Sequence, residues 1–346
     1  DTRPYGAGYH YDDPSILGFS HLHKSGGGCA DFLDILFMPL PLNSGMTDEE
    51  LYSKQYQAVL SHKDEKAEPG YYSVGLYDKQ LTVELTASRR CGLQRYTYAS
   101  EGEIPVIVDL KYGSESACTI QSEYDVDTVY ASAFEWVDPY TVRGYRCSNG
   151  WTPGQQVYFY STFSTPIKEC VLYVDDRRME GMTSAEGTNI KALLTFESST
   201  GELEVRTALS SVDTQGAAKN LWAETKNKTF DAIREEAAGK WHDVLGQIEI
   251  ETTDRKKKEL FYTSLHNVML YPFLFSDVDH CFRGPDWQVH QTDGFDYYGG
   301  VIGFWDTFRA ACPLLSVLHP EVAEDYVKTL LEHYKFACQL PIWTLW

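Results

Sequence analysis

The 346-residue chain is acidic, with 50 Asp and Glu residues against 30 Lys and Arg and a formal net charge of −20. This charge disfavours nucleic acids and anionic membrane surfaces as partners, because their phosphate groups would be repelled. The composition, 43% hydrophobic and 14% aromatic, is typical of a globular protein with enough residues for two domains. No run of about 18 apolar residues predicts a membrane span, and no signal peptide is visible at the start of the chain.

Up to about residue 210 the chain predicts many short β-strands. Three stretches alternate apolar and polar residues between turn signals: 71–98, 157–179 and 191–212. The first is broken at Asp78-Lys79 and the second at Pro166. The third predicts a hairpin with Ser199-Thr200-Gly201 at its turn. Strands at this spacing are typical of an antiparallel β-sandwich.

The hydrophobic period becomes helical after residue 212. Residues 214–248 have helical spacing, and residues 254–273 predict a helix that begins at Asp254 and ends at Pro272. Two more helices are predicted within 303–320 and 321–338. Pro313 should kink or divide the first of these, because proline lacks the amide hydrogen that an interior helical position donates.

This order of elements predicts a multi-domain chain, β first and α second. We expect a β-sandwich domain over 1–212, a helical linker over 213–251 and an incomplete helical domain over 252–346. The last residues, "LPIWTLW", are apolar and aromatic, so we expect the natural protein to continue beyond Trp346. Eight cysteines without CxxC spacing argue against a zinc ribbon and favour free thiols over disulfides.

Two motifs in the segment "FSHLHKSGGGCADFLDILFMP" need a choice between alternatives. His21 and His23 lie two apart, so on a strand both would face the same side and could share a metal ion. We favour hydrogen-bonded structural histidines, because no complete ligand set is evident. The glycine triplet at 26–28 lacks the Lys-Ser/Thr of a phosphate loop, and we interpret it as a permissive backbone turn.

Two further motifs contain carboxylates. Asp277 and Asp279 have D-x-D spacing, but the rest of a calcium loop is missing, so we favour a solvated acidic loop. Asp306 and Arg309 lie three apart, which would let them pair on one helix face beside Trp305. One interpretation is a simple ion pair. The other is a carboxylate that Arg309 positions to bind sugar hydroxyls beside the Trp305 ring. The spacing alone does not distinguish between these two interpretations.

Several long segments resemble, in order and spacing, the glycoside hydrolase family 92 α-mannosidases. They include "GYHYDDPSILGFSHLHKSGGGCADFLDILFMP", "YYSVGLYDKQLTVELTASRRCGLQRYTY" and "TDGFDYYGGVIGFWDTFRAACPLL". The resemblance covers nearly the whole chain. It implies an N-terminal β-sandwich, linker helices and the first helices of an (α/α)₆ barrel.

The resemblance also implies an exo-acting, inverting, calcium-dependent enzyme that releases terminal mannose from N-glycans or mannan. Inversion uses a general acid and a general base about 6.5–9.5 Å apart, with a water between them. In the family both groups, and the main Ca²⁺ ligands, come from segments beyond the position of Trp346. No catalytic residue and no metal ligand can therefore be assigned to this chain, and we expect it to be inactive alone.

The "WDTFR" segment is similar to the family segment whose Asp contacts mannose hydroxyls. The resemblance therefore implies that Asp306 contacts substrate, with Trp305 and Arg309 as neighbours. It also implies sugar contacts in a sandwich loop at Tyr5, His10 and Tyr11.

We expect a secreted, periplasmic or cell-surface protein whose partners are mannose-containing glycans. The alternative is a non-catalytic carbohydrate-binding or cell-surface sandwich protein. The linkage preference and the oligomeric state are not readable from these residues.

Overall fold

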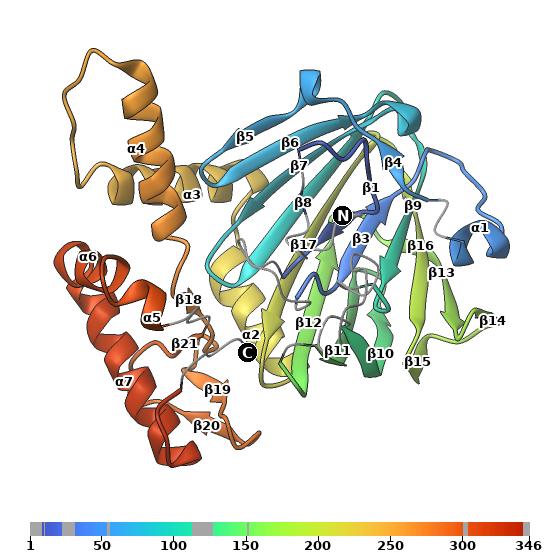
Figure 1. Cartoon of the computed structure of the whole chain (residues 1–346). Coiled ribbons are helices and arrows are strands. Elements are labelled where there is room, and N and C mark those ends of the chain that lie inside the picture. The colour runs from blue at the N-terminus through green and yellow to red at the C-terminus, as the bar shows by residue number, and fades with distance from the viewer. Residues whose placement is uncertain are drawn as a thin grey trace.

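The computed structural model describes residues 9, 11–22, 32–53, 56–112, 127–150, 152–299 and 304–341, with Tyr77 and Trp305 described by their backbone alone. Two antiparallel sheets pack face to face in the first part of this chain, and helices lie to one side of them in the second (Figure 1). The predicted order, a β-sandwich followed by a helical region, is confirmed.

The larger sheet has nine strands. In spatial order they are β15 (Ser184–Gly187), β10 (Thr128–Asp138), β11 (Thr141–Asn149), β12 (Gln155–Phe163), β17 (Glu202–Ser210), β8 (Cys91–Tyr98), β7 (Leu81–Ala87), β6 (Tyr71–Leu76) and β5 (Lys66–Glu68). All of its neighbouring strands are antiparallel.

The smaller sheet has six strands. In spatial order they are β14 (Arg177–Met179), β13 (Ile167–Val174), β16 (Ile190–Ser198), β9 (Gly102–Asp109), β3 (Leu36–Pro39) and β2 (Phe19–Ser20). A separate short pair joins β1 (Ser15–Ile16) to β4 (Ala58–Val59). Three short helices, α1 (Asp48–Tyr52), η1 (His62–Asp64) and η2 (Tyr77–Lys79), occur in the connections.

Apolar side chains from both sheets form the main core. Phe37, Val106 and Phe196 of the smaller sheet and Phe159 and Val205 of the larger one are essentially inaccessible to solvent. Phe159, Phe196 and Val205 belong to strands of the predicted alternating stretches. By contrast, β3 and most of β9 are buried on both faces.

The hairpin expected over 191–212 is wrong, although its two strands and its turn are present. β16 belongs to the six-stranded sheet and β17 to the nine-stranded sheet, so the turn carries the chain across the core. The same crossing occurs from β8 to β9 and from β12 to β13. The alternation of apolar and polar residues cannot distinguish a hairpin from a connection between sheets. In both cases each strand has one apolar face toward the core, whether the next strand pairs with it or lies in the opposite sheet.

Helices α2 (Thr214–Thr225) and α3 (Phe230–Leu245) cover part of the outer face of the nine-stranded sheet (Figure 1). Leu221, Phe230 and Ile233 of these helices pack on Leu93 and Ala208 of β8 and β17. Asp213 and Thr229 cap the helix N-termini with their side-chain oxygens.

Helix α4 (Arg255–Val268) begins after its N-cap Asp254, as predicted, but ends before Pro272. Two short β-ribbons follow where a loop was expected. They pair β18 (Phe273–Leu274) with β21 (Tyr298–Gly299), and β19 (Cys281–Arg283) with β20 (Val289–Gln291).

The last helices are α5 (Phe304–Thr307), α6 (Ala311–Leu318) and α7 (Pro320–Ala337). The predicted division of the 303–320 segment is confirmed. Pro313 lies in the first turn of α6, where its missing amide hydrogen would have no intrahelical acceptor.

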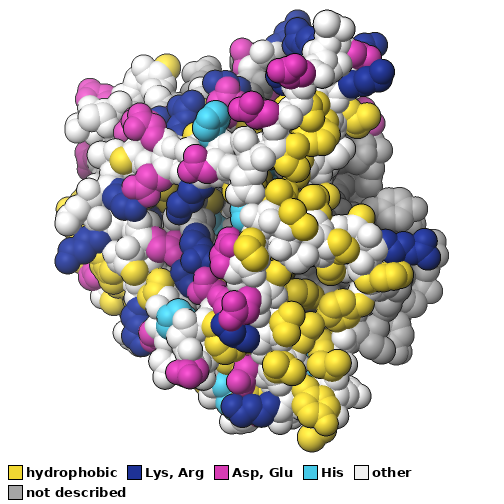
Figure 2. All heavy atoms as spheres, turned by 90° about the vertical axis from the view of Figure 1, so that its left-hand side faces the viewer, with side chains coloured by type: hydrophobic (Ala, Val, Ile, Leu, Met, Phe, Trp, Pro, Cys, Tyr) yellow, Lys and Arg dark blue, Asp and Glu magenta, His cyan; other side chains and the backbone are white. Residues whose placement is uncertain are grey.

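The helical region exposes many apolar side chains. Figure 2 shows them gathered on the face that carries the helices. Exposed members include Leu260 of α4, Val317 of α6, and Val327, Leu331 and Tyr334 of α7. None of the described helices is both long enough and apolar enough to cross a membrane.

Candidate functional site

The sandwich and the helical region are joined by two arginines in the turn between β7 and β8. Arg90 donates from Nη1 to Glu224 of α2 at 2.9 Å and from Nε to the carbonyl of Ser276 at 2.8 Å. Arg89 donates from Nη2 to Asp296, just before β21, at 2.6 Å. These charge-assisted hydrogen bonds fix one sandwich turn against both α2 and the β-ribbons.

Asp277 lies buried at this junction, which contradicts its interpretation as part of a solvated loop. Its carboxylate accepts hydrogen bonds from Ser210 Oγ and Asn220 Nδ2, each at 2.7 Å. Burial raises its pKa to about 6, although these two donors oppose the shift. Only Asp279 of the pair is partly exposed, and it accepts from Lys219 Nζ at 2.6 Å.

A cavity of about 570 Å³ lies between the nine-stranded sheet and the ribbon that starts at Phe273; we call it the interdomain cavity. Apolar walls come from Phe32, Phe273 and Phe275 among others. Its polar lining comes from side chains of which several are already hydrogen-bonded within the protein: Gln155, Gln156, Ser210, Ser211, Asn220, Asp277, Arg90 and Arg283. A mostly apolar cavity with a few converging polar groups is the usual form of a small-molecule site.

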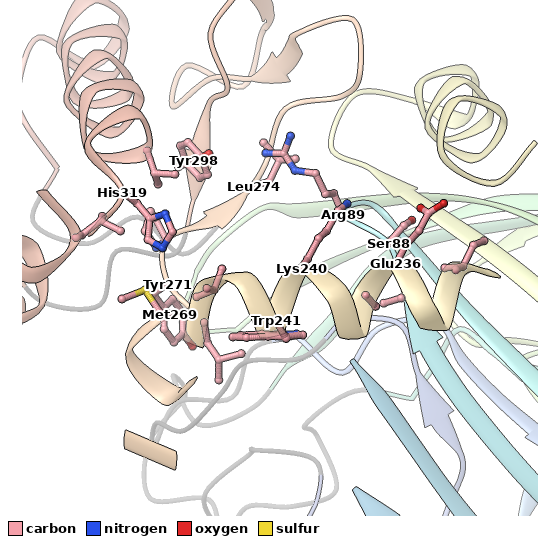
Figure 3. A pocket seen from close by; sticks show the side chains of 18 residues that line it. Ser88, Arg89, Glu236, Lys240, Trp241, Met269, Tyr271, Leu274, Tyr298 and His319 are labelled. Carbon is pink, nitrogen blue, oxygen red and sulfur yellow. The ribbon is translucent and has the colours of Figure 1, made fainter. Parts of the chain in front are cut away.

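A second cavity of about 460 Å³ shares the β7–β8 turn with the first. Figure 3 shows Lys240 and Trp241 from α3, Arg89 from the turn, and Tyr298 and His319 from the helical region around it. The remaining lining is mainly apolar, from α3, from residues 269–274 after α4, and from α6 and α7. This cavity therefore has fewer hydrogen-bonding groups for a polar ligand than the interdomain cavity.

Asp306 is exposed on the short helix α5 and lines neither of these two cavities. The pairing expected with Arg309 is not formed within the described part of the chain, because α5 ends at Thr307 and the helical face does not continue. Arg309 instead places its guanidinium 5.5 Å from the ring centroid of Phe308. Nothing is described of the Trp305 side chain, so the sugar-binding roles of these three residues stay predictions.

Tyr11 lies at the surface of the sandwich, with 62% of its side chain exposed. Its ring stacks on His62 with centroids 3.9 Å apart, and His62 in turn hydrogen-bonds to Glu65. Within the described ranges no contact joins Tyr11 to α5. Tyr5 and His10 lie outside the described residues, so their predicted sugar contacts also stay predictions.

His21 has the structural role that the sequence favoured. Its Nδ1 donates to the carbonyl of Ile35 at 2.9 Å, and its Nε2 lies 3.0 Å from Gln94 Nε2 as acceptor. Both ring nitrogens are therefore engaged. His23 and the glycine triplet lie outside the described residues. Over the described ranges no group of three or more His, Cys, Asp or Glu side chains could hold a metal ion.

A fully buried ion cluster supports one wall of the interdomain cavity. Arg146 Nη1 donates to Asp34 at 2.5 Å, Nη2 donates to Asp127, and Nε donates to the carbonyl of Leu110 at 3.1 Å. The amide of Gln155, which lines the cavity, donates to the second oxygen of Asp34 at 3.2 Å. The cluster therefore orients a cavity side chain through Asp34, a residue of the segment that opens with "FSHLH".

Sequence reasoning missed the junction residues Arg89, Arg90 and Asp296, and it placed Asp277 in a solvated loop. A signal was available for Asp277, because "FLFSDVDHCF" places it inside an apolar run where a solvated loop would be polar. The arginines follow a strand directly, but their partners lie at least 130 residues later. Only the folded arrangement brings these groups together.

Comparison with known protein families gives two consecutive matches. The glycosyl hydrolase family 92 N-terminal domain matches residues 1–210, and the family 92 catalytic domain matches residues 216–346. The boundary between them falls between the end of β17 and the first turn of α2.

Solved structures of the same family are similar over the whole chain. An α-mannosidase of family GH92 from Bacteroides thetaiotaomicron is 32% identical, with a TM-score of 0.87, over 100% of this chain and 47% of that one. An inverting mannosidase of the family from the same species is 27% identical, with a TM-score of 0.82, over 99% of this chain and 44% of that one. The first of these has also been solved with mannoimidazole.

A curated relative from Arthroderma benhamiae, described as an uncharacterized secreted glycosidase, is 24% identical over 89% of this chain and 40% of its own length. The chain thus spans less than half the length of these relatives. Its two domain matches are consecutive and cover nearly all of its residues. On this basis, the chain belongs to glycosyl hydrolase family 92.

Proposed function

We propose that this chain forms the sandwich and the opening helices of an exo-acting, inverting α-mannosidase that releases terminal mannose from N-glycans or mannan. The observation that carries the proposal is the similarity to a GH92 α-mannosidase, at 32% identity and a TM-score of 0.87 over the whole chain. The inverting relative supports the stereochemistry, and the mannoimidazole complex of a neighbour supports a mannose-type ligand.

Under this proposal the reaction is a single displacement by water. A general acid protonates the departing glycosidic oxygen while a general base activates water on the opposite face of the sugar. We assign neither group to the described residues. Asp306, with Trp305 and Arg309 beside it, is proposed to contact the hydroxyls of the terminal mannose, and Tyr5, His10 and Tyr11 to contribute from the sandwich.

Calcium dependence is part of the proposal on the family resemblance alone. The described residues do not fit a metal site, because they contain no group of three carboxylate, histidine or cysteine ligands. We therefore expect the ligands to come from other residues of the intact enzyme. A secreted or cell-surface location is likewise proposed, supported by the relative described as a secreted glycosidase.

The test uses residues 1–346 and, separately, the polypeptide isolated from its natural source, whose intact mass is compared with 39.3 kDa. Each is incubated with mannan and with α-linked mannobiose, and the released sugar is followed by proton NMR. We expect no release by residues 1–346 alone. From a longer natural protein we expect β-mannose as the first product, loss of activity with a chelator, and recovery with Ca²⁺.

Release of α-mannose would overturn the inverting mechanism, and chelator-resistant activity would overturn the calcium requirement. Mannan binding by the natural protein without any hydrolysis would support the alternative, a non-catalytic carbohydrate-binding protein.

A further inference from the structure

Tyrosines line the outer face of the nine-stranded sheet beyond the part that α2 covers. The strand register places Glu186, Ala133, Tyr145, Tyr158 and Ser210 opposite one another on five neighbouring strands. These residues form a straight row across β15, β10, β11, β12 and β17. At about 4.8 Å per strand the row spans about 19 Å. Val142 and Phe159 of the same strands point into the core, so the two tyrosines point outward.

The two tyrosine rings of this row lie close together, and two further aromatic side chains near it are partly exposed. The rings of Tyr145 and Tyr158 have centroids 5.7 Å apart with an interplanar angle of 53°. Tyr130, at a bulge in β10, has 42% of its side chain exposed. Trp287, on the turn between β19 and β20, is 37% exposed and packs over Gly154. We call Tyr130, Tyr145, Tyr158 and Trp287 the aromatic track.

The aromatic track is continuous with the interdomain cavity. Gln156, Ser210, Arg283 and Trp287 all line that cavity. The hydroxyl of Tyr158 donates to Gln156 at 3.1 Å, and the Arg283 guanidinium lies 5.8 Å from the Tyr158 ring centroid. A linear ligand with one end in the cavity can therefore extend along the track toward the edge strand β15.

The chemistry of the track matches a neutral polyhydroxylated chain. Aromatic faces stack on the apolar faces of pyranose rings, and the amide of Gln156 and the tyrosine hydroxyls can bond sugar hydroxyls. Burial raises the pKa of Tyr130 to about 12, so its hydroxyl stays a neutral hydrogen-bond donor in ordinary buffers. The carboxylate of Glu186 at one end and the net charge of −20 disfavour an anionic polysaccharide.

We propose that the aromatic track is an accessory glycan-binding site that holds the inner residues of an extended mannan or N-glycan chain outside the interdomain cavity. The identity of the sugar rests on the proposed function, whereas the track itself rests on the geometry of the sheet. The structure assigns the site to one face of the sandwich, so binding requires no catalytic group.

The test measures binding of residues 1–346 to soluble α-mannan by affinity electrophoresis and calorimetry, with free mannose as the short ligand. We expect mannan to bind and free mannose to bind much more weakly. Tyr130→Ala and Trp287→Ala should each weaken mannan binding by about 2- to 10-fold, because each removes one stacking ring. In the double variant, mannan binding should be weakened by the product of the two single-variant factors.

Tyr140→Ala is the matched control. Tyr140 is 48% exposed and lies in the β10–β11 turn, about 25 Å along the strands from Tyr130. We expect this variant to bind mannan like the wild type. Thermal unfolding of every variant shows whether the fold is retained. Tyr130 and Trp287 belong to different elements, so if one variant fails to fold, the other variant still tests the proposal.

Equal mannan binding by the wild type and both track variants would overturn the proposal, as would an equal loss in Tyr140→Ala. The proposal would also be overturned if Tyr130→Ala or Trp287→Ala changed the sedimentation coefficient of the protein but left its mannan binding unchanged. The aromatic track would then be an interface between two copies of the chain. Binding of another neutral glycan but not mannan, with the same dependence on Tyr130 and Trp287, would retain the track and refute the mannose specificity of the proposed function.

Discussion

Asp277→Asn should change how the stability of the protein depends on pH. The Asp277 carboxyl has a pKa of about 6 in the folded protein, compared with 3.8 for the free side chain, because burial disfavours its charged form. That difference corresponds to about 3 kcal/mol at about 1.36 kcal/mol per pKa unit. The variant keeps an oxygen that can accept from Ser210 or Asn220, but it cannot titrate.

Because the pKa is higher in the folded state, the folded protein binds this proton more tightly and the free energy of unfolding rises as the pH falls. From pH 7.5 to pH 5 the Asp277 carboxyl alone should add about 1.4 kcal/mol. The full contribution is reached only below about pH 4, and it is lost as the pH rises through about 6. The wild type should therefore gain about 1.4 kcal/mol relative to Asp277→Asn over this interval.

Urea unfolding followed by tryptophan fluorescence at pH 5.0 and pH 7.5 measures this difference. Comparing the two proteins removes the contributions of groups that titrate in both. Asp279→Asn is the matched control: burial raises the pKa of Asp279, but hydrogen bonds from Lys219 and Cys281 outweigh it and lower the pKa overall. Its difference from the wild type should be nearly the same at pH 5.0 and pH 7.5, because a carboxyl with a lowered pKa titrates below this interval. A pH-independent difference for Asp277→Asn would refute the reasoning.

Three further changes test other parts of the structure. Arg146→Met should lower the free energy of unfolding by about 3–5 kcal/mol in the same urea assay, since it leaves two buried carboxylates without their cation. Gly201→Ala should cost more than Gly181→Ala in thermal unfolding: both have positive φ, but only at Gly201 would the new Cβ meet a backbone oxygen, at 2.4 Å. Iodoacetamide followed by peptide mass spectrometry should label exposed Cys338 long before buried Cys91, whose pKa is raised by burial; the opposite order would contradict the described burial.

The sequence predicted the architecture because its local signals agree with the global fold. Asp254 caps a helix as expected, the meander from β6 to β8 follows its alternating pattern, and Pro313 falls at a division between helices. These features depend on neighbours within a few residues. Pairing between sheets does not, so the β16–β17 turn was assigned to a hairpin although its strands lie in opposite sheets.

The candidate site was less predictable for a related reason. Asp277 has a buried carboxylate because Ser210 and Asn220 approach it from elements more than 50 residues earlier. The expected pairing of Asp306 with Arg309 assumed a helix that continues past Thr307, and it does not. Local spacing therefore indicated which residue types were present, but the environment that sets their chemistry came from tertiary packing.

The crossings between sheets also constrain how the protein can be made. β8 is flanked by β7 on one side and by β17 on the other, and Tyr96 lies opposite Leu203 in that second pair. While the chain is being synthesised, one edge of β8 therefore stays open until more than a hundred further residues have left the ribosome. Pairing of β8 with β17 is slow because the two strands are far apart in the sequence. Until then the unpaired edge of β8 can pair with a strand of another nascent chain. Production of this polypeptide should respond to slower translation or to chaperones that shield strand edges.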